Sequence, residues 1–519
     1  MELEKIRDIE EATWVNRKEI FRLGMAVLFI VGIMLYLESQ GEISNMLIIA
    51  GIIGGYMAIN IGANDVANNV GPAVGSRALT MAGAIAIAAI FEAAGALIAG
   101  GDVVSTIKKG IIDPANISST DVFVWLMMAA LLAGALWLNV ATAIGAPVST
   151  THSIVGGVLG AGVAAGGWDV VNWATMGQIA ASWVISPVLG GIIAAAFLYL
   201  IKRTITYKKD MLRAARRIVP ILLAIMALAF ATYLALKGFK KIWKIDTSMA
   251  LMIGAGVAVI IYGISRPWVV RRTKVNSNDK QGINQLFTLP LIFAAALLSF
   301  AHGANDVANS IGPLAAINDA LATGGISSKA AIPLWVMMIG AIGIALGLAL
   351  YGPKLIKTVG TEITELDQMR AFCIALSAAI TVIIATQLGL PVSSTHIAVG
   401  AVFGVGFLRE YLKTSYAKMI EEIHLHHLDR DEQVVKQFLE EFRYANLDEK
   451  SKMLAQLKAH SADADLSKKE RRKLKRVYRH ELVKRTALLK IAAAWVITVP
   501  VSAGLAAMLF FMIRGMLLP

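Results

Sequence analysis

The residues best suited to chemistry lie in a heptapeptide that occurs twice, Gly-Ala-Asn-Asp-Val-Ala-Asn, at Gly62–Asn68 and again at Gly303–Asn309. Each copy ends a long apolar run, and a perfect repeat half a chain apart indicates an internal duplication. An aspartate inside a membrane segment is costly and is tolerated mainly where it binds something. Clusters of carboxylate and amide oxygens suit hard cations. The cation ligands predicted from the two copies are Asn64, Asp65, Asn305 and Asp306.

A second motif is duplicated as well, since Gly145-Ala-Pro-Val-Ser-Thr-Thr-His152 is echoed by Gly389-Leu-Pro-Val-Ser-Ser-Thr-His396. Ser, Thr and Pro favour a helix start, and the free N–H groups of such a start attract anions. Adjacent hydroxyls add donors for an oxyanion such as phosphate. Either histidine could orient its turn by hydrogen bonding or contact the substrate. The predicted oxyanion ligands are Asn68, Ser149, Thr150, Thr151, Asn309, Ser393, Ser394 and Thr395.

The two motifs together predict cotransport. In a continuous helix Asn64 and Asn68 would share one face, with Asp65 beside them. Two carboxylates and an oxyanion in one site would repel each other without cations. An inside-negative potential also opposes anion import by about 2.3 kcal/mol per charge per 100 mV. A monovalent phosphate therefore needs two monovalent cations to turn this penalty into a gain, and a divalent one needs more than two.

Composition places these motifs in an all-α polytopic membrane protein. Of the 519 residues 57% are hydrophobic and only 16% are charged, against about 25% in soluble proteins. Several apolar runs are long enough to cross a bilayer as helices, and they lack the alternation of a barrel. The net charge of +13 is concentrated in a few loops, so we expect no nucleic-acid partner. Cys373 is the only cysteine, which excludes an intrachain disulfide.

About 12–13 membrane segments are predicted, and two pairs of them have almost no connector and form helical hairpins with Pro-containing polar tips. The predicted segments are Phe21–Leu37, Met46–Ile61, Ala78–Gly100, Val122–Gly145, Val148–Ala165, Gly177–Ile201, Ile218–Lys237, Ser248–Ile264, Leu286–Ala301, Ala330–Tyr351, Met369–Leu388, Val392–Leu408 and Leu488–Ile513.

Loop charge predicts the orientation in the cell membrane. The basic loops Lys202–Arg217 and Arg266–Lys280 are separated by two spans and should both be cytoplasmic. Counting spans from them puts the N-terminus and residues 409–486 inside and the C-terminus outside. The loop with the four lysines at 237, 240, 241 and 244 would then lie outside, against the positive-inside rule. The two heptapeptides then enter the membrane from opposite sides. Inverted structural repeats of this kind are typical of secondary transporters, whose sites lie between the repeats.

The resulting organisation has six parts. They are an N-terminal segment with an extra span (1–45), a first transport repeat (46–201), basic loops with linking spans (202–285), a second repeat (286–408), a charged cytoplasmic helical insertion (409–486) and a final span (487–519). The histidines at 424, 426 and 427 in the insertion are expected to be solvated, and its contact is either anionic lipid or a cytoplasmic regulator.

Single charged residues inside the predicted spans are interpreted individually. Glu92 has no acidic counterpart in the second half, so it is predicted to ligate a particular cation or to carry a proton; the alternative is a bond between helices. Arg77 and Lys108 lie near predicted membrane edges, where long basic side chains extend toward water.

The paired Gly-Ala-Asn-Asp-Val-Ala-Asn and Pro-Val-Ser-(Thr/Ser)-Thr-His motifs resemble those of the inorganic phosphate transporter (PiT) family, sodium- or proton-coupled phosphate permeases. The resemblance covers most of Met46–Leu408 and the last span, and includes Thr106-Ile-Lys-Lys-Gly110. It implies substrate bound between two hairpins, usually in a homodimer, and a transport role for Glu92. It also implies that Asp65, Asn68, Asp306 and Asn309 serve the cation and phosphate site, with the hydroxyls at 149–151 and 393–395 around phosphate.

We therefore expect a cation-coupled symporter that imports inorganic phosphate, with sodium ions as the cotransported cofactor and no prosthetic group. The alternatives are a proton-coupled phosphate permease, a sulfate permease of the same architecture and a channel. An intramembrane hydrolase using Ser149 or Ser393 with the nearby histidine is disfavoured, because the arrangement is duplicated and lacks a Gly-x-Ser-x-Gly elbow. The chain is accordingly not expected to be an enzyme.

Overall fold

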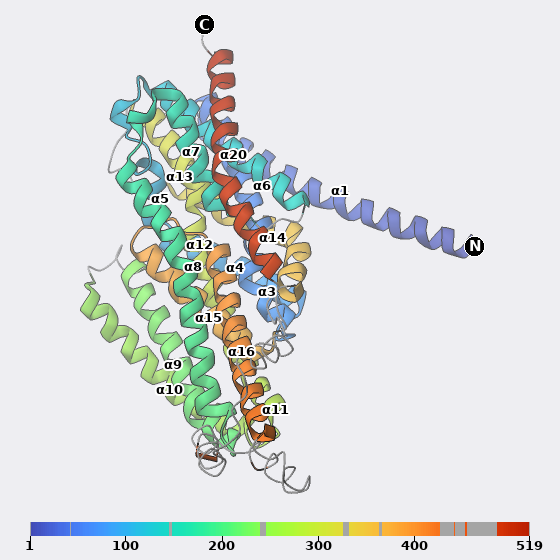
Figure 1. The fold of residues 1–519 in the computed structure, drawn as a ribbon. Helices are drawn as coiled ribbons and strands as arrows, with labels where there is room; N and C mark the ends of the chain where they lie inside the picture. Colours follow the sequence, from blue (N-terminus) through green and yellow to red (C-terminus); the bar gives the residue numbers. More distant parts are fainter. Residues whose placement is uncertain are drawn as a thin grey trace.

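The computed structural model describes residues 2–41, 43–144, 148–238, 245–324, 332–362, 366–425, 441, 452–453 and 485–517. These residues are helical apart from turns and one isolated bridge between Ile112 and Val171, so the predicted all-α class is confirmed. The helices, labelled as in Figure 1, are α1 (Glu2–Glu38), α2 (Asn45–Asn64), α3 (Ala67–Gly75), α4 (Met81–Ala99), α5 (Gly101–Lys109), α6 (Thr120–Ile144), α7 (Thr150–Gly166), α8 (Trp173–Ile201), α9 (Met211–Lys237), α10 (Thr247–Arg272), α11 (Lys280–Leu286), α12 (Thr288–Asp306), α13 (Ala308–Thr323), α14 (Leu334–Glu362), α15 (Gln368–Gln387), α16 (Ser394–Leu425) and α20 (Arg485–Leu517).

Eleven stretches of the described chain are long and apolar enough to cross a membrane, which is fewer than the 12–13 predicted. The two predicted segments outside this set are Val148–Ala165 and Val392–Leu408, which correspond to α7 and the first part of α16. Each begins at a polar hairpin tip, and α7 has only 17 residues. A full crossing takes about 20 apolar residues, so α7 is the short second arm of the hairpin α6–α7, whereas α16, the second arm of the hairpin α15–α16, continues to Leu425.

Both heptapeptides interrupt a long apolar helix. α2 ends at Asn64 and α3 begins at Ala67, while α12 ends at Asp306 and α13 begins at Ala308. A proline follows in each second helix, and proline removes a backbone donor there. The continuous helix that the spacing of Asn64 and Asn68 assumes is therefore interrupted between them, at Asp65 and Val66.

The hairpin tips begin their second helices with serine caps. The Ser149 hydroxyl accepts a hydrogen bond from the backbone N–H of His152 at 3.1 Å, and the Ser393 hydroxyl accepts one from the N–H of His396 at 3.3 Å. Side-chain caps of this kind satisfy backbone donors that the helix leaves open. At the second tip Gly389 has a φ of 68°, a backbone conformation that glycine adopts without strain. Gly145, Ala146 and Pro147 of the first tip lie outside the described residues.

Helices of the two halves pack on each other reciprocally. α2 packs on α14 as α4 packs on α12, and α7 packs on α20 as α16 packs on α8. Helices at corresponding positions of the two halves thus exchange packing partners, as a two-fold relation between duplicated units would require. The inverted orientation of the two halves stays a prediction.

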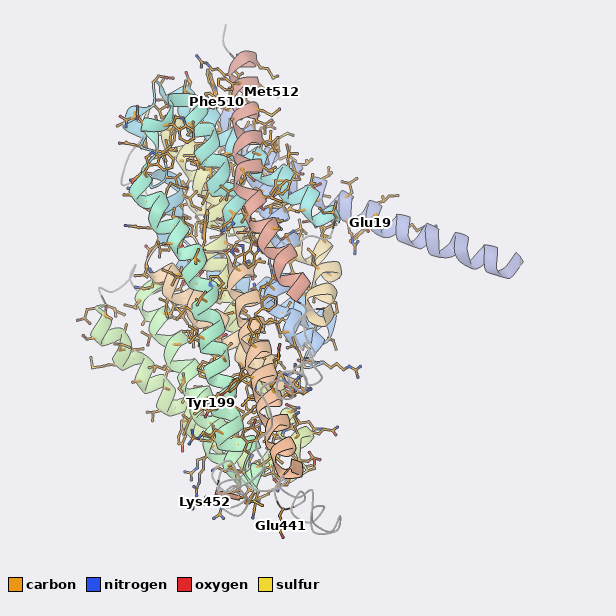
Figure 2. All side chains as sticks on the ribbon, in the orientation of Figure 1. Glu19, Tyr199, Glu441, Lys452, Phe510 and Met512 are labelled. Carbon is orange, nitrogen blue, oxygen red and sulfur yellow. The ribbon has the colours of Figure 1, made fainter. Side chains whose placement is uncertain are left out.

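The two ends of the molecule carry different segments. The C-terminal end of α20 lies at one end, with α5, α7 and α13 nearby, and α11 lies at the other (Figure 1). Figure 2 places Phe510 and Met512 at the first end and Glu441 and Lys452 at the second. Most of the charged insertion predicted at 409–486, including its histidine cluster, lies outside the residues whose side chains are described. Which end faces the cytoplasm stays a prediction.

Candidate functional site

The two duplicated aspartates meet at the tip of α7. The Thr150 hydroxyl donates to Oδ2 of Asp65 at 2.6 Å and lies 3.5 Å from Oδ2 of Asp306. Both aspartates are at most 1% exposed, and Thr150 is fully buried. Two carboxylates from opposite halves of the chain therefore share one hydroxyl between them in the interior of the helical bundle.

The second hairpin tip supplies matching contacts. The Thr395 hydroxyl donates to Oδ1 of Asp65 at 2.9 Å and accepts from the amide of Asn68 at 2.8 Å. The Ser394 hydroxyl donates to Oδ2 of Asp306 at 3.1 Å. Asp65 is thus held by a hydroxyl from each tip, so the site is built from both hairpins and both broken helices.

Asn309 completes a central cluster of polar side chains. Its members are Asp65, Asn68, Thr150, Thr151, Asp306, Asn309, Ser394 and Thr395. The side-chain amide of Asn309 donates to the hydroxyls of Thr150 and Thr151, each at 3.1 Å. The Thr151 hydroxyl in turn donates to the backbone carbonyl of Val392 at 2.9 Å, which joins one tip to the other. Thr150 therefore uses its single proton on Asp65 and its lone pairs on Asn309.

Two of the predicted cation ligands contact the hairpins through their side-chain amides. The amide of Asn64 donates to Thr142 on α6 at 3.0 Å. The amide of Asn305 donates to Thr386 on α15 at 2.9 Å and to the carbonyl of Leu390 at 3.1 Å, while its oxygen accepts from the Val392 N–H at 3.3 Å. These asparagines fix the position of a hairpin against its broken helix.

Glu92 reaches the cluster through a histidine that the sequence did not single out. Oε1 of Glu92 accepts from the amide of Asn69 at 2.7 Å, and Oε2 lies 2.6 Å from Nδ1 of His302. Nε2 of His302 lies 3.0 Å from Oδ2 of Asp306. Glu92 and His302 are both fully buried. His302 directly precedes the second heptapeptide, where the first copy has Ile61. Comparing the residues that flank the two copies would have found it.

The arrangement fits a small hard cation. Ligand atoms of Asp65, His302 and Asp306 lie within 4.8 Å of one another, and hydroxyl oxygens of both tips border the same carboxylates. Oxygen-rich sites of this type suit alkali and alkaline-earth ions. The hydroxyl and amide protons around them suit an oxyanion. The cluster therefore offers groups of both kinds, oxygens suited to a cation and protons suited to an anion.

A model of the phosphate transporter family matches residues 61–506 of the chain, which covers both heptapeptides and both hairpins. The chain belongs to the phosphate transporter family. A "Putative phosphate permease" of Helicobacter pylori strain J99 is 53% identical over 523 residues, covering 98% of each chain. A relative of the same description from Pyrococcus abyssi is 41% identical over 361 residues, covering 69% of this chain and 88% of its own. A solved structure, "The sodium-dependent phosphate transporter", matches 91% of this chain and 100% of its own, with a TM-score of 0.73 and 31% identity.

Family membership excludes the hydrolase alternative: the protein is a phosphate transporter and not an enzyme. Local geometry agrees, since the Ser149 hydroxyl contacts the backbone of His152 and not its ring. The His152 ring lies on Trp183 with centroids 3.8 Å apart, and the His396 ring stacks on Trp495 at 3.5 Å. The two histidine rings meet edge to face at 4.4 Å. In this transporter the histidines thus join the two tips to α8 and α20.

The tryptophans reveal a third duplicated segment of the transporter. Ile-Ala-Ala-Ser-Trp-Val-Ile-Ser ends at Ser186, and Ile-Ala-Ala-Ala-Trp-Val-Ile-Thr ends at Thr498. Aligning the apolar spans would have revealed this pair, but both segments look like ordinary membrane helices.

The expectation for Lys108 is wrong. The lysine does not extend toward water; its ammonium lies 2.9 Å from the carboxylate of Asp319, and both side chains are buried.

Proposed function

We propose that this member of the phosphate transporter family is a cation-coupled symporter, with sodium as the coupling ion, that imports inorganic phosphate across the cell membrane by alternating access. The observation that carries the proposal is the meeting of Asp65 and Asp306 at Thr150, where hydroxyls of both hairpin tips converge. A structural neighbour that is a sodium-dependent phosphate transporter supports sodium over protons.

The hydrogen bonds explain why cation and phosphate would bind together. Thr150, Ser394 and Thr395 each have one hydroxyl proton, and each donates it to a carboxylate. A cation that binds those carboxylates competes for the same lone pairs and frees the protons for phosphate oxygens. A bound cation also offsets the repulsion between carboxylate and phosphate. Cation binding therefore prepares the oxyanion site, and phosphate alone meets two carboxylates.

The burial of the site supports alternating access. Asp65, Asp306, Asn68, Asn309 and the hydroxyl residues of the cluster are at most 1% exposed. Neither face of the molecule can deliver phosphate to them without movement of the surrounding helices. The hairpin tips and broken helices come from different halves, so a relative movement of the halves would open the site.

The test is uptake of labelled phosphate by proteoliposomes that contain the purified protein. A sodium gradient should drive uptake above that in potassium, and Asp306→Asn should abolish it. Ser105→Ala on the exposed surface of α5 is the matched control. Uptake that follows a proton gradient without sodium would favour the proton-coupled alternative. Inhibition of phosphate uptake by equimolar sulfate would favour a general oxyanion carrier. Unchanged uptake by Asp306→Asn would refute the proposed site.

A further inference from the structure

A buried ion pair outside the central cluster joins the two halves of the transporter. Nζ of Lys108 on α5 lies 2.9 Å from Oδ2 of Asp319 on α13, with side-chain exposures of 7% and 4%. The attraction in such a pair repays the removal of two charges from water only in part, so a buried pair is weak evidence for a stabilising role. Its position suggests a different role.

The pair lies between the central cluster and one end of the molecule. Asp319 follows Asn309 by ten residues on α13, which places it about 15 Å along the helix at 1.5 Å per residue. α13 ends at Thr323, just beyond it, near the end where α20 also terminates (Figure 1). In the first half the tenth residue after Asn68 is Ala78, so the charge is not part of the duplicated scaffold.

Both ends of the molecule have a similar neutral contact, and each has an ion pair among the described residues: Lys108–Asp319 joins two helices, whereas Arg370–Asp367 joins residues three apart at the start of α15. The Thr120 hydroxyl donates to the carbonyl of Gly324 after α13 at 3.2 Å. At the corresponding place after α3, the amide of Gln368 donates to the carbonyl of Ser76 at 3.0 Å. The ion pair between α5 and α13 thus distinguishes this end of the molecule from the other, where the pair lies within one helix start.

α5 also connects the lysine to the second hairpin. Two residues before Lys108, the Thr106 hydroxyl donates to the carbonyl of Gly389 at 2.7 Å. Gly389 begins the turn that leads to Ser394 and Thr395 of the central cluster. α5 packs closely on α13, because a Cβ at Gly312 would lie 2.8 Å from Ile107. A movement that separates Lys108 from Asp319 would therefore also act on the hairpin tip.

We propose that Lys108 is an accessory oxyanion site on the route from this end of the molecule to the central cluster, and that Asp319 occupies the lysine while the route is closed. The proposal rests on the proposed function. A carboxylate and a phosphate compete for the same ammonium group, since each offers oxygens to its three donors. An arriving phosphate displaces Asp319, and the separation of α5 from α13 lets it pass inward.

Two variants give opposite predictions for phosphate uptake in proteoliposomes oriented so that the α5 end faces the added phosphate. Asp319→Asn removes the competitor and should lower the KM for phosphate about threefold, while the neutral pair Lys108→Gln/Asp319→Asn should raise it about tenfold. Lys108→Arg keeps the charge and should stay near the wild-type KM. Sodium activation should be unchanged in all three variants, because the central carboxylates are intact.

Measurement from the opposite face separates binding from a general structural effect. The double variant should keep its wild-type KM there, because Lys108 lies on the other route. An equal KM increase from both faces, or an unchanged KM in the double variant, would overturn the proposal even if Asp319→Asn does not fold. Loss of phosphate uptake in the wild-type protein would instead refute the proposed function, and this proposal with it.

Discussion

The two helix crossings that frame the site have the same backbone packing and different chemistry. Where α12 crosses α4, a Cβ at Gly303 would lie 2.1 Å from the carbonyl oxygen of Glu92. Where α2 crosses α14, a Cβ at Gly62 would lie 1.9 Å from the carbonyl oxygen of Ile344. Gly62 and Gly303 begin the two heptapeptides, so Glu92 and Ile344 occupy corresponding positions.

The side chains at these crossings differ in charge. One crossing holds Glu92 against His302, and the corresponding residues of the other are the apolar Ile344 and Ile61. His302 extends the first pair to Asp306, whereas the described side chains that donate to the Asp65 carboxylate are the hydroxyls of Thr150 and Thr395. Close helix packing therefore needs only the glycines. The charged pair makes the two central carboxylates unequal, which implies different roles in cation binding.

The largest effect is expected from breaking the charged crossing on one side. Glu92→Leu leaves His302 buried beside Asp306 without its second carboxylate, which should cost about 3–5 kcal/mol of stability. Glu92→Ile/His302→Ile copies the apolar crossing and should recover most of that stability while phosphate uptake stays low. Thermal unfolding in detergent, followed by intrinsic fluorescence, measures both variants. A double variant as unstable as the single one would show that the two crossings are not interchangeable scaffolds.

Glycine replacements test whether the two crossings are alike in packing. Gly62→Ala and Gly303→Ala each force a methyl group against a backbone carbonyl, and each should destabilise the protein by about 1–3 kcal/mol. The matched control is Gly24→Ala, since a Cβ there would meet no atom within 4 Å. The measurement is the shift in unfolding temperature. Strong destabilisation by only one of the pair would contradict the common backbone geometry.

Aspartate replacements sharpen the difference between the carboxylates. His302 places a positive charge, when protonated, 3.0 Å from Asp306, whereas the donors that contact Asp65 within the described part of the chain are hydroxyls, so we expect Asp65 to depend more on the transported cation. The sodium concentration for half-maximal uptake should rise about tenfold more in Asp65→Glu than in Asp306→Glu, a difference of about 1.4 kcal/mol. Sodium titrations of phosphate uptake decide this. Equal shifts would mean that both carboxylates hold the cation in the same way.

The sequence predicted that the two heptapeptides and the two hairpin tips meet, because both motifs place polar residues in apolar spans, where they are conspicuous. It did not reveal His302, because this histidine lies outside the repeated residues and becomes conspicuous only when the positions flanking the two copies, Ile61 and His302, are compared. It also missed the partnership of Lys108 with Asp319, since 211 residues separate them and only helix packing brings them together. The helix break at Asp65 was missed for a local reason: the spacing of Asn64 and Asn68 fits a continuous helix equally well.

The smallest effect is expected where a predicted phosphate ligand serves as a helix cap. Ser149 accepts from the N–H of His152, and Thr150 next to it donates to Asp65. Ser149→Ala should therefore cost about 1 kcal/mol of stability through the lost cap, with little change in the KM for phosphate. Thr150→Val, which removes the hydroxyl at the carboxylates, should raise that KM strongly. Phosphate titrations of both variants separate the two roles of neighbouring hydroxyls. A KM increase in Ser149→Ala as large as that in Thr150→Val would mean that the cap also contacts the substrate.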